Sequence, residues 1–216
     1  MTPFTSFYPY ILPDVPGCPS LSVDQALSST LIDFCEKTLI LQADMDPVTI
    51  VKGVVDYDLE PPKDHLVTKI MKVFYRSNEI RPTSPDDIMS ASLYNKNYPE
   101  AKPEEGPPKL YTQKDARTFS IYPYPKETEK LALTLRVALK PTRSATQCDD
   151  ILFEEYAEII GHGVVSRLAL SSNKPYSDPK LAGVKNVMYT AGINLARQRA
   201  NRGYVRSNTQ VRIRKI

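Results

Sequence analysis

The residues best suited to bind a charged partner lie in the last segment of the chain, RQRANRGYVRSNTQVRIRKI. No Asp or Glu follows Asp178, although the whole chain has 28 basic and 25 acidic residues and a net charge of only +3. Arginine and lysine bind both phosphate and carboxylate oxygens. The segment therefore has two possible roles: it grips nucleic acid through its phosphates, or it is an arm that orders when it docks on another protein subunit.

The final residues, TQVRIRKI, favour the docking arm. Val211 and Ile213 alternate with Arg212 and Arg214, which is the pattern of a strand with one apolar and one cationic side. Such a strand can extend a partner's sheet while its arginines reach acidic residues. We therefore predict an extended arm over residues 204–216 whose binding residues are Tyr204, Arg206, Val211, Arg212, Ile213, Arg214 and Lys215.

Other residues that could do chemistry are few and scattered. His65 and His162 are the only histidines, and no phosphate-binding, nucleophile-elbow or zinc-protease motif is present. His162 stands between two glycines, which predict a close approach by another helix. A group of acidic residues is expected to form a solvated helix face: Glu154, Glu155 and Glu158. We predict no catalytic residue, no metal site and no cofactor.

The cysteines and the apolar segments constrain the setting. Cys18, Cys35 and Cys148 are odd in number and lack C-x-x-C spacing, so we expect three free thiols in a reducing compartment. The first twenty residues have no basic stretch followed by an apolar run and do not resemble a secretory signal. No apolar stretch approaches the roughly 20 residues that span a bilayer, so we expect no membrane partner.

Helical periodicity appears near both ends of the chain. A proline-rich lead-in, YPYILPDVPGCPS, should be extended. Helices are expected over residues 23–38, 151–170 and 179–202, the first with a capping box from Ser22 to Gln25. Asp149 or Asp150 should cap the second, and Asp178 the third, which Gly203 should end. The apolar face of the third helix is expected to comprise Leu181, Val184, Val187, Met188, Ala191 and Leu195.

The middle of the chain changes to the two-residue period of strands. VTIVKGVVDYDLEPP predicts two short strands joined through Gly53, and HLVTKIMKVFYRSNEI predicts a longer strand that turns at Ser77-Asn78. RTFSIYPYP and KLALTLRVALKP predict two more. In the last, one buried face should hold Leu131, Leu133, Leu135, Val137 and Leu139.

These elements predict an α+β fold. A small helical bundle, residues 1–43 and 142–203, carries an inserted antiparallel β-sandwich-like domain, residues 44–141, between its first and second helices. The loop YNKNYPEAKPEEGPPK lies within the insertion. The arm, 204–216, follows the bundle.

Several segments in this order resemble the head-to-tail adaptor (connector) proteins of tailed bacteriophages. They include ILPDVPGCPSLSVDQALSSTLIDFCEKT, DMDPVTIVKGVVDYDLEPP, LTLRVALKPTRSATQCDDILFEEYAEIIGHGVVSRL, KPYSDPKLAGV and GINLARQRANRGY. The resemblance implies a structural virion protein, not an enzyme. It would form a ring of twelve copies under the portal, extend the DNA channel, and dock the tail nozzle or tail tube.

This resemblance also implies a setting for each partner. The protein would be made in the host bacterial cytoplasm and reside in the virion neck, where double-stranded DNA passes without sequence-specific binding. The arm would then dock on the portal protein, and the β-domain would stand toward the tail. A nucleic-acid-binding protein with a basic C-terminal tail remains the alternative.

Overall fold

The computed structural model describes residues 1–88 and 104–202. The chain divides into two compact units: Met1–Ile40 together with the chain from Pro141 onward, and Leu41–Lys140. The first unit is helical and the second is built of strands, so the fold is α+β, as predicted.

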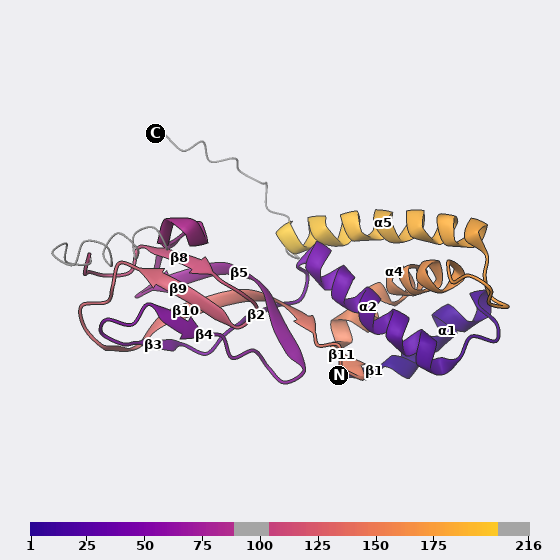
Figure 1. Cartoon of the computed structure of the whole chain (residues 1–216), viewed down its shortest axis with the longest axis horizontal. Coiled ribbons are helices and arrows are strands. Elements are labelled where there is room, and N and C mark those ends of the chain that lie inside the picture. Colours follow the sequence, from indigo (N-terminus) through magenta and orange to yellow (C-terminus); the bar gives the residue numbers. More distant parts are fainter. Residues whose placement is uncertain (89–103, 203–216) are drawn as a thin grey trace. The chain divides into compact units, whose positions relative to one another are not determined.

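Three long helices form the first unit (Figure 1). They are α2 (Ser20–Thr38), α4 (Asp150–Ala169) and α5 (Pro179–Arg202), each in contact with the other two. The predicted helices are confirmed to within about three residues, and so is their packing into a bundle. The bundle core contains Phe7, Ile11, Leu27, Leu31, Phe34, Leu152 and Ile160, all fully buried.

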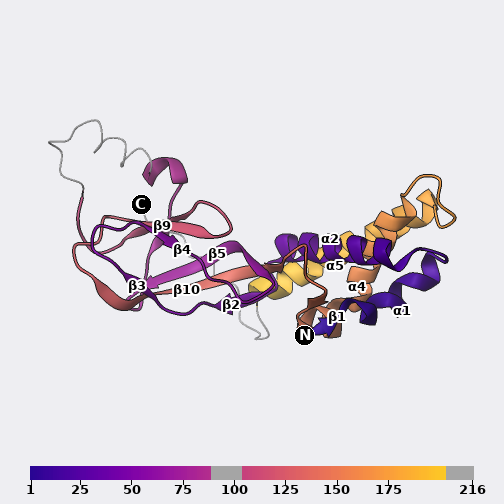
Figure 2. The same ribbon diagram turned by 60° about the horizontal axis from the view of Figure 1, so that its bottom comes forward.

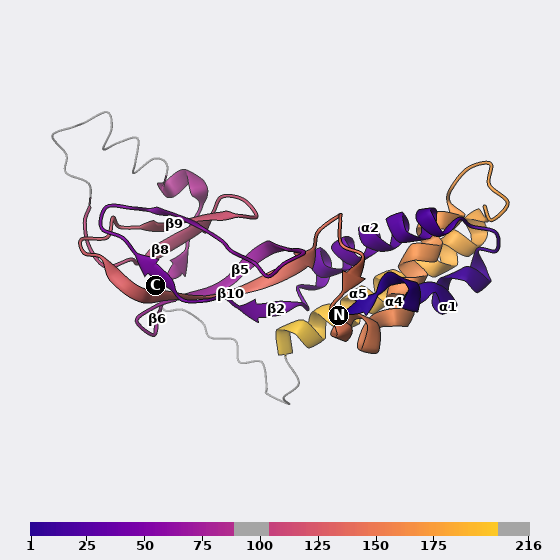
Figure 3. The ribbon, with the colours of Figure 1, turned by 90° about the horizontal axis from the view of Figure 1, so that it is seen from below.

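The proline-rich lead-in is not extended, so that prediction is wrong. It folds into short helical turns, η1 (Phe4–Phe7), α1 (Tyr8–Ile11) and η2 (Leu12–Asp14), and α1 lies against α4 (Figure 3). Pro9 and Pro13 are the second residues of α1 and η2, within the first turn, where a missing N–H removes no helical hydrogen bond. Two short strands, β1 (Thr2–Pro3) and β11 (Gln147–Cys148), pair antiparallel beside them.

The helix starts differ in how they are capped. Asp178 caps α5 as predicted, accepting hydrogen bonds from the backbone N–H groups of Lys180 and Leu181 at 2.9 and 3.1 Å. The predicted capping box is wrong, because α2 begins at Ser20 after Pro19 and the Ser22 N–H donates to the Pro19 carbonyl. Asp149 occupies the cap position of α4 without a side-chain capping bond.

The larger sheet of the second unit has five strands, in which β10 lies between β2 and β5 (Figure 2). β6 continues the order beyond β5, and β3 also pairs with β10. The strands are β2 (Gln42–Asp44), β3 (Val48–Ile50), β5 (His65–Tyr75), β6 (Asn78–Glu79) and β10 (Glu129–Pro141). The chain turns between β5 and β6 at Arg76 and Ser77, both with positive φ, next to the predicted turn.

The second sheet has the order β4-β9-β8-β7. Its strands are β4 (Asp56–Asp58), β7 (Arg81–Pro82), β8 (Leu110–Gln113) and β9 (Thr118–Tyr122). β7 and β8 run parallel, so the sheet is not wholly antiparallel as expected. Phe119 and Ile121 on β9 are fully buried and, with Leu133 and Leu135 on β10, are among the large core side chains of this unit.

Leu131 departs from the predicted buried face of β10. Leu133, Leu135, Val137 and Leu139 are buried, but Leu131 is 66% exposed and has a left-handed φ of 51°. The pairing of β10 with β3 shifts register between Glu129 and Leu133, and this irregularity turns the side chain outward.

Candidate assembly interface

Helix α5 buries a face of mainly small residues against its own bundle. Ala182, Gly192 and Ala196 are buried there with Tyr189 and Ile193. A Cβ at Gly192 would come within 2.9 Å of Ile159 Cδ1 on α4, so only glycine permits this approach. The inner face of α5 is therefore complete without the apolar residues that the sequence pattern assigned to the core.

Those apolar residues lie on the outer side of α5 instead. Val187 is 69% exposed and Leu195 66%, and Val184, Met188 and Ala191 are also exposed. The prediction that they form the buried face, together with Leu181, is wrong for all except the half-buried Leu181. We call Val184, Val187, Met188, Ala191 and Leu195 the outer stripe.

The outer stripe is continuous and has no cover within its own unit. Each member lies three or four residues from another member, so together they cover one side of the helix for about 16 Å. Figure 1 shows α5 along one side of the helical unit, and no other described element of that unit lies on its outer side. A row of exposed apolar side chains of this kind is a candidate protein-binding surface.

The charges of α5 are all positive. Lys180, Lys185, Arg197, Arg199 and Arg202 face no Asp or Glu on the same helix. Three of them are engaged inside the unit: Lys185 pairs with Asp14 at 2.5 Å, Arg199 with Glu155 at 2.6 Å, and Arg197 donates to the Lys37 carbonyl at 2.9 Å. The other two, Lys180 and Arg202, stand in line with the outer stripe at its two ends and make no ion pair among the described residues.

The glycines that flank His162 have the role predicted from sequence. Gly161 lies against Tyr10, whose Cβ and carbonyl oxygen would be 3.1 and 3.2 Å from a Cβ at that position. Gly163 lies against Thr30 and Tyr189. His162 itself is partly buried, and burial together with the nearby Lys185 lowers its pKa from the usual 6.5. Glu158, at 3.8 Å, opposes that shift without overcoming it.

The remaining titratable groups give no sign of catalysis. Cys18, Cys35 and Cys148 are buried free thiols, and burial raises the pKa of Cys148 to about 12 and that of Cys35 further. Thiols with a pKa raised in this way, as in Cys35 and Cys148, stay protonated and unreactive. Within residues 1–88 and 104–202, no three His, Cys, Asp or Glu side chains are grouped to hold a metal ion, and no described helix is long and apolar enough to cross a membrane.

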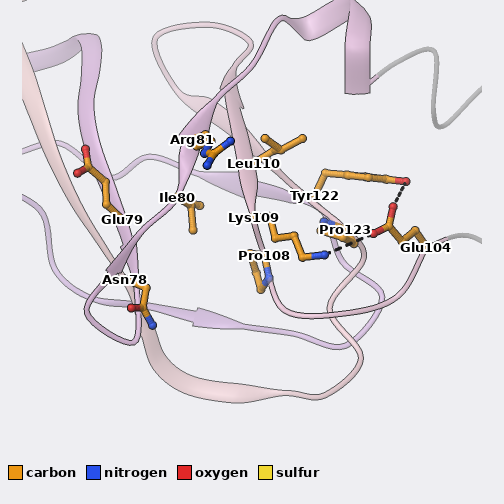
Figure 4. A pocket seen from close by; sticks show the side chains of 10 residues that line it. All are labelled: Asn78, Glu79, Ile80, Arg81, Glu104, Pro108, Lys109, Leu110, Tyr122 and Pro123. Carbon is orange, nitrogen blue, oxygen red and sulfur yellow. Dashed lines mark hydrogen bonds and ion pairs between the residues drawn. The ribbon is translucent and has the colours of Figure 1, made fainter. Parts of the chain in front are cut away.

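A hollow of about 520 Å³ opens on the β-unit (Figure 4). Ile80, Leu110 and Tyr122 give it apolar walls, and Glu104 crosses its rim to Lys109 at 3.8 Å and to the Tyr122 hydroxyl at 3.4 Å. Asn78, Glu79 and Arg81 make the rest of its described lining mixed in character.

The predicted arm lies outside the described residues, so the structure does not test it. This holds for Tyr204, Arg206, Val211, Arg212, Ile213, Arg214 and Lys215, for the proposed helix stop at Gly203, and for most of the loop over residues 94–109. The exposure of the outer stripe was not predicted from the sequence. Its signal was present, because α5 carries apolar residues on more of its circumference than one buried face requires.

Comparison with known families identifies the class of protein. A model of the SU10 adaptor protein family matches residues 12–214, nearly the whole chain. This protein therefore belongs to the SU10 adaptor protein family, a family of phage head-to-tail adaptors. No curated protein matches the chain. Family membership implies that it is a structural component of a phage virion, located in the neck, where it interacts with portal and tail components.

Proposed function

We propose that this protein forms a closed ring of twelve copies beneath the portal of a DNA-filled capsid. The ring extends the DNA channel, which the genome traverses during packaging and ejection without sequence-specific contacts, and offers the tail nozzle or tail tube a docking surface. The observation that carries the proposal is the family match over residues 12–214, which includes the bundle, the β-unit and most of the basic segment.

Each part of the chain has a role in this proposal. Residues 1–43 and 142–203 are the adaptor core, 44–141 the inserted β-domain that faces the tail, and 204–216 the portal-binding arm. The uncovered outer stripe supports ring formation, because burying an exposed valine or leucine contributes about 2 kcal/mol. In a closed ring, one face of each copy binds a different face of the next copy.

Deleting the arm tests the portal contact. A chain that ends at Gly203 should keep its fold, because α5 and the core of the bundle are complete at Arg202. It should no longer co-sediment with portal rings of the same phage, while the full-length chain does. Circular dichroism checks the fold, and undiminished binding by the shortened chain would refute the arm.

Two matched variants separate the apolar and charged contributions. Arg212→Ala/Arg214→Ala should weaken portal binding mainly at low salt, and Val211→Ser/Ile213→Ser should weaken it at low and high salt alike. The alternative function rests on the absence of acids after Asp178. A peptide of residues 203–216 that bound duplex DNA with a steep salt dependence would favour it.

A further inference from the structure

We propose that the outer stripe of α5 packs against an acidic face on α4 of the next copy, with Glu154 and Glu158 of that copy directed toward Arg202. This inference rests on the proposed ring and names the two surfaces that form each of its joints. We define the acidic face by Tyr10, Glu154 and Glu158.

The acidic face carries exposed carboxylates that are available to a partner. Glu158 is 80% exposed and lies 3.8 Å from His162, and Glu154 is exposed and has no ion pair among the described residues. Gly161 follows these glutamates at helical spacing, and Tyr10 rests on Gly161 with its ring against Phe153 at 6.2 Å. Tyr10 is 45% exposed, so the face offers an aromatic surface beside two carboxylates.

The acidic face and the outer stripe lie on different sides of the bundle. The side of α4 that faces α5 is marked by Glu155, which pairs with Arg199, and by Ile159 and Gly163, which touch Gly192 and Tyr189. Glu154 and Glu158 point roughly a quarter to a third of a turn away from that side, at 100° per residue. The stripe points away from the bundle altogether, so one copy cannot close the two surfaces on each other.

Charge decides which partner suits the outer stripe. Two stripes facing each other would bring together helices without an acidic residue, whose stripes end in the cations Lys180 and Arg202, so a two-fold pairing is disfavoured. The chain's own last residues are no better, since Arg206, Arg212, Arg214 and Lys215 are accompanied by no acid. An apolar and acidic surface complements the stripe, and each bundle presents one.

The two ends of the stripe differ in charge. Lys180 lies two residues from Asp178, whose carboxylate caps the helix and offsets the lysine. Arg202 has no neighbouring carboxylate on its own helix, and the partial negative charge of the helix C-terminus offsets its charge only in part. The other arginine of the last turn, Arg199, is already paired with Glu155. Arg202 is therefore the cation of α5 that we expect to pair with a carboxylate of the next copy.

This joint can be repeated from copy to copy, because it uses a different surface on each of the two partners. Each copy uses its stripe on one neighbour and its acidic face on the other, so a joint leaves one free surface of each kind at the ends of the assembly. Head-to-tail contacts of this type close into rings when the rotation per copy divides a full turn.

A charge exchange on full-length protein tests the joint. The number of adaptor copies on portal rings is measured by mass photometry as adaptor concentration rises. Glu154→Lys/Glu158→Lys should raise the concentration needed for ring completion roughly fivefold or more, and Arg202→Glu should do likewise. The variant with all three changes should return to within about threefold of wild type, because the exchanged charges attract again.

Matched controls exclude general effects. Lys180→Glu makes the same charge change at the other end of the same helix and should cost less than Arg202→Glu. Glu60→Lys/Glu127→Lys adds the same positive charge on the β-unit and should leave assembly unchanged. Val187→Asp/Leu195→Asp should abolish multimers, whereas Leu21→Asp/Leu170→Asp, at positions of similar exposure, should not.

The outcomes distinguish a failure of the proposed joint from a failure of the proposed ring. Wild-type protein that places no multiple copies on the portal overturns the proposed ring, and the joint with it. Wild-type rings with no rescue in the triple variant overturn the joint alone and leave the ring standing. If Val187→Asp/Leu195→Asp fails to bind the portal even as a single subunit, the stripe contacts the portal and not the next copy, and the joint is overturned.

Discussion

The ring of Tyr189 lies directly on the backbone of Gly163. A Cβ at Gly163 would stand 2.8 Å from Cδ2 and Cε2 of Tyr189 and 2.7 Å from Cγ2 of Thr30, closer than such atoms can approach. The same tyrosine donates a hydrogen bond to Asp33 at 2.9 Å. One residue of α5 thus fixes the spacing of all three long helices.

Replacing Gly163 with alanine should destabilise the bundle by about 1–3 kcal/mol, because the tyrosine ring and the threonine methyl must both move. Gly183→Ala is the matched control. Nothing lies within 4 Å of its Cβ position, so alanine there should be neutral or should stabilise α5 by about 0.5–1 kcal/mol. Urea denaturation of both variants checks the pair, and equal effects would contradict the close packing.

Tyr189→Phe should lower the free energy of unfolding by about 1–2 kcal/mol, since it removes a hydrogen bond to a charged carboxylate at a buried position. Asp33 would keep Lys37 at 2.8 Å and Arg167 at 3.7 Å, which limits the loss. Tyr8→Phe removes a similar bond, to Asp24 at 2.9 Å, in a less buried setting and should cost less. The reverse order in thermal denaturation would count against this account.

Leu131→Gly should stabilise the β-unit by about 1 kcal/mol. The leucine side chain is largely exposed, and its left-handed φ carries a steric cost that glycine avoids. Leu21→Gly changes an equally exposed leucine within helix α2 and should destabilise the protein by about 1 kcal/mol. A loss of stability in both variants would show that Leu131 makes contacts worth more than its strain.

His162 should make stability sensitive to mild acid. Burial and Lys185 hold the pKa of His162 below its usual 6.5 in the folded chain, so the unfolded chain takes up this proton first as the pH falls. The stability linked to neutral His162 is present above pH 6.5 and is lost as the pH falls through the folded pKa.

The measurement for His162 is a difference between two proteins. Wild type should lose more unfolding free energy than His162→Asn between about pH 7.5 and about pH 5.5, because other titrating groups are common to both. Portal attachment of His162→Asn should be unchanged at neutral pH, since the residue binds no partner in this account. An identical pH profile for the two proteins would contradict the lowered pKa.

Long periodic segments of the sequence predicted the architecture well. The helices at 23–38 and 151–170 and the central strands follow from period alone, because each buries a face of large apolar residues or alternates strictly. The bounds of the helix at 179–202 also follow from period, although its large apolar residues are not the ones that it buries. The turn through Gly53 was also predictable, since its φ of 73° suits glycine best. The two turns of the lead-in that contain Pro9 and Pro13 were not, because proline in the first turn of a helix and proline in an extended chain look the same in sequence.

The candidate interface could be seen in the sequence only in part. The outer stripe was recognised as an apolar line but was assigned to the core, since valine, methionine and leucine outweigh alanine and glycine in any measure of hydrophobicity. The true inner face uses Ala182, Gly192 and Ala196 to bring helices close, and close packing leaves no strong periodic signal. Tertiary contacts decide which side of a helix faces inward. In α5 the side with small residues is buried, and the side with larger apolar residues is exposed.

The β-unit begins and ends at neighbouring points. The backbone N–H of Leu139 donates to the carbonyl of Leu41 at 2.8 Å, so the two connections that bound these hundred residues are already tied together. Because its two ends are adjacent, the β-unit can in principle be replaced by a short loop or by a different domain without a break in the bundle. We therefore expect changes of length within the β-unit to leave the buried core of the bundle unchanged.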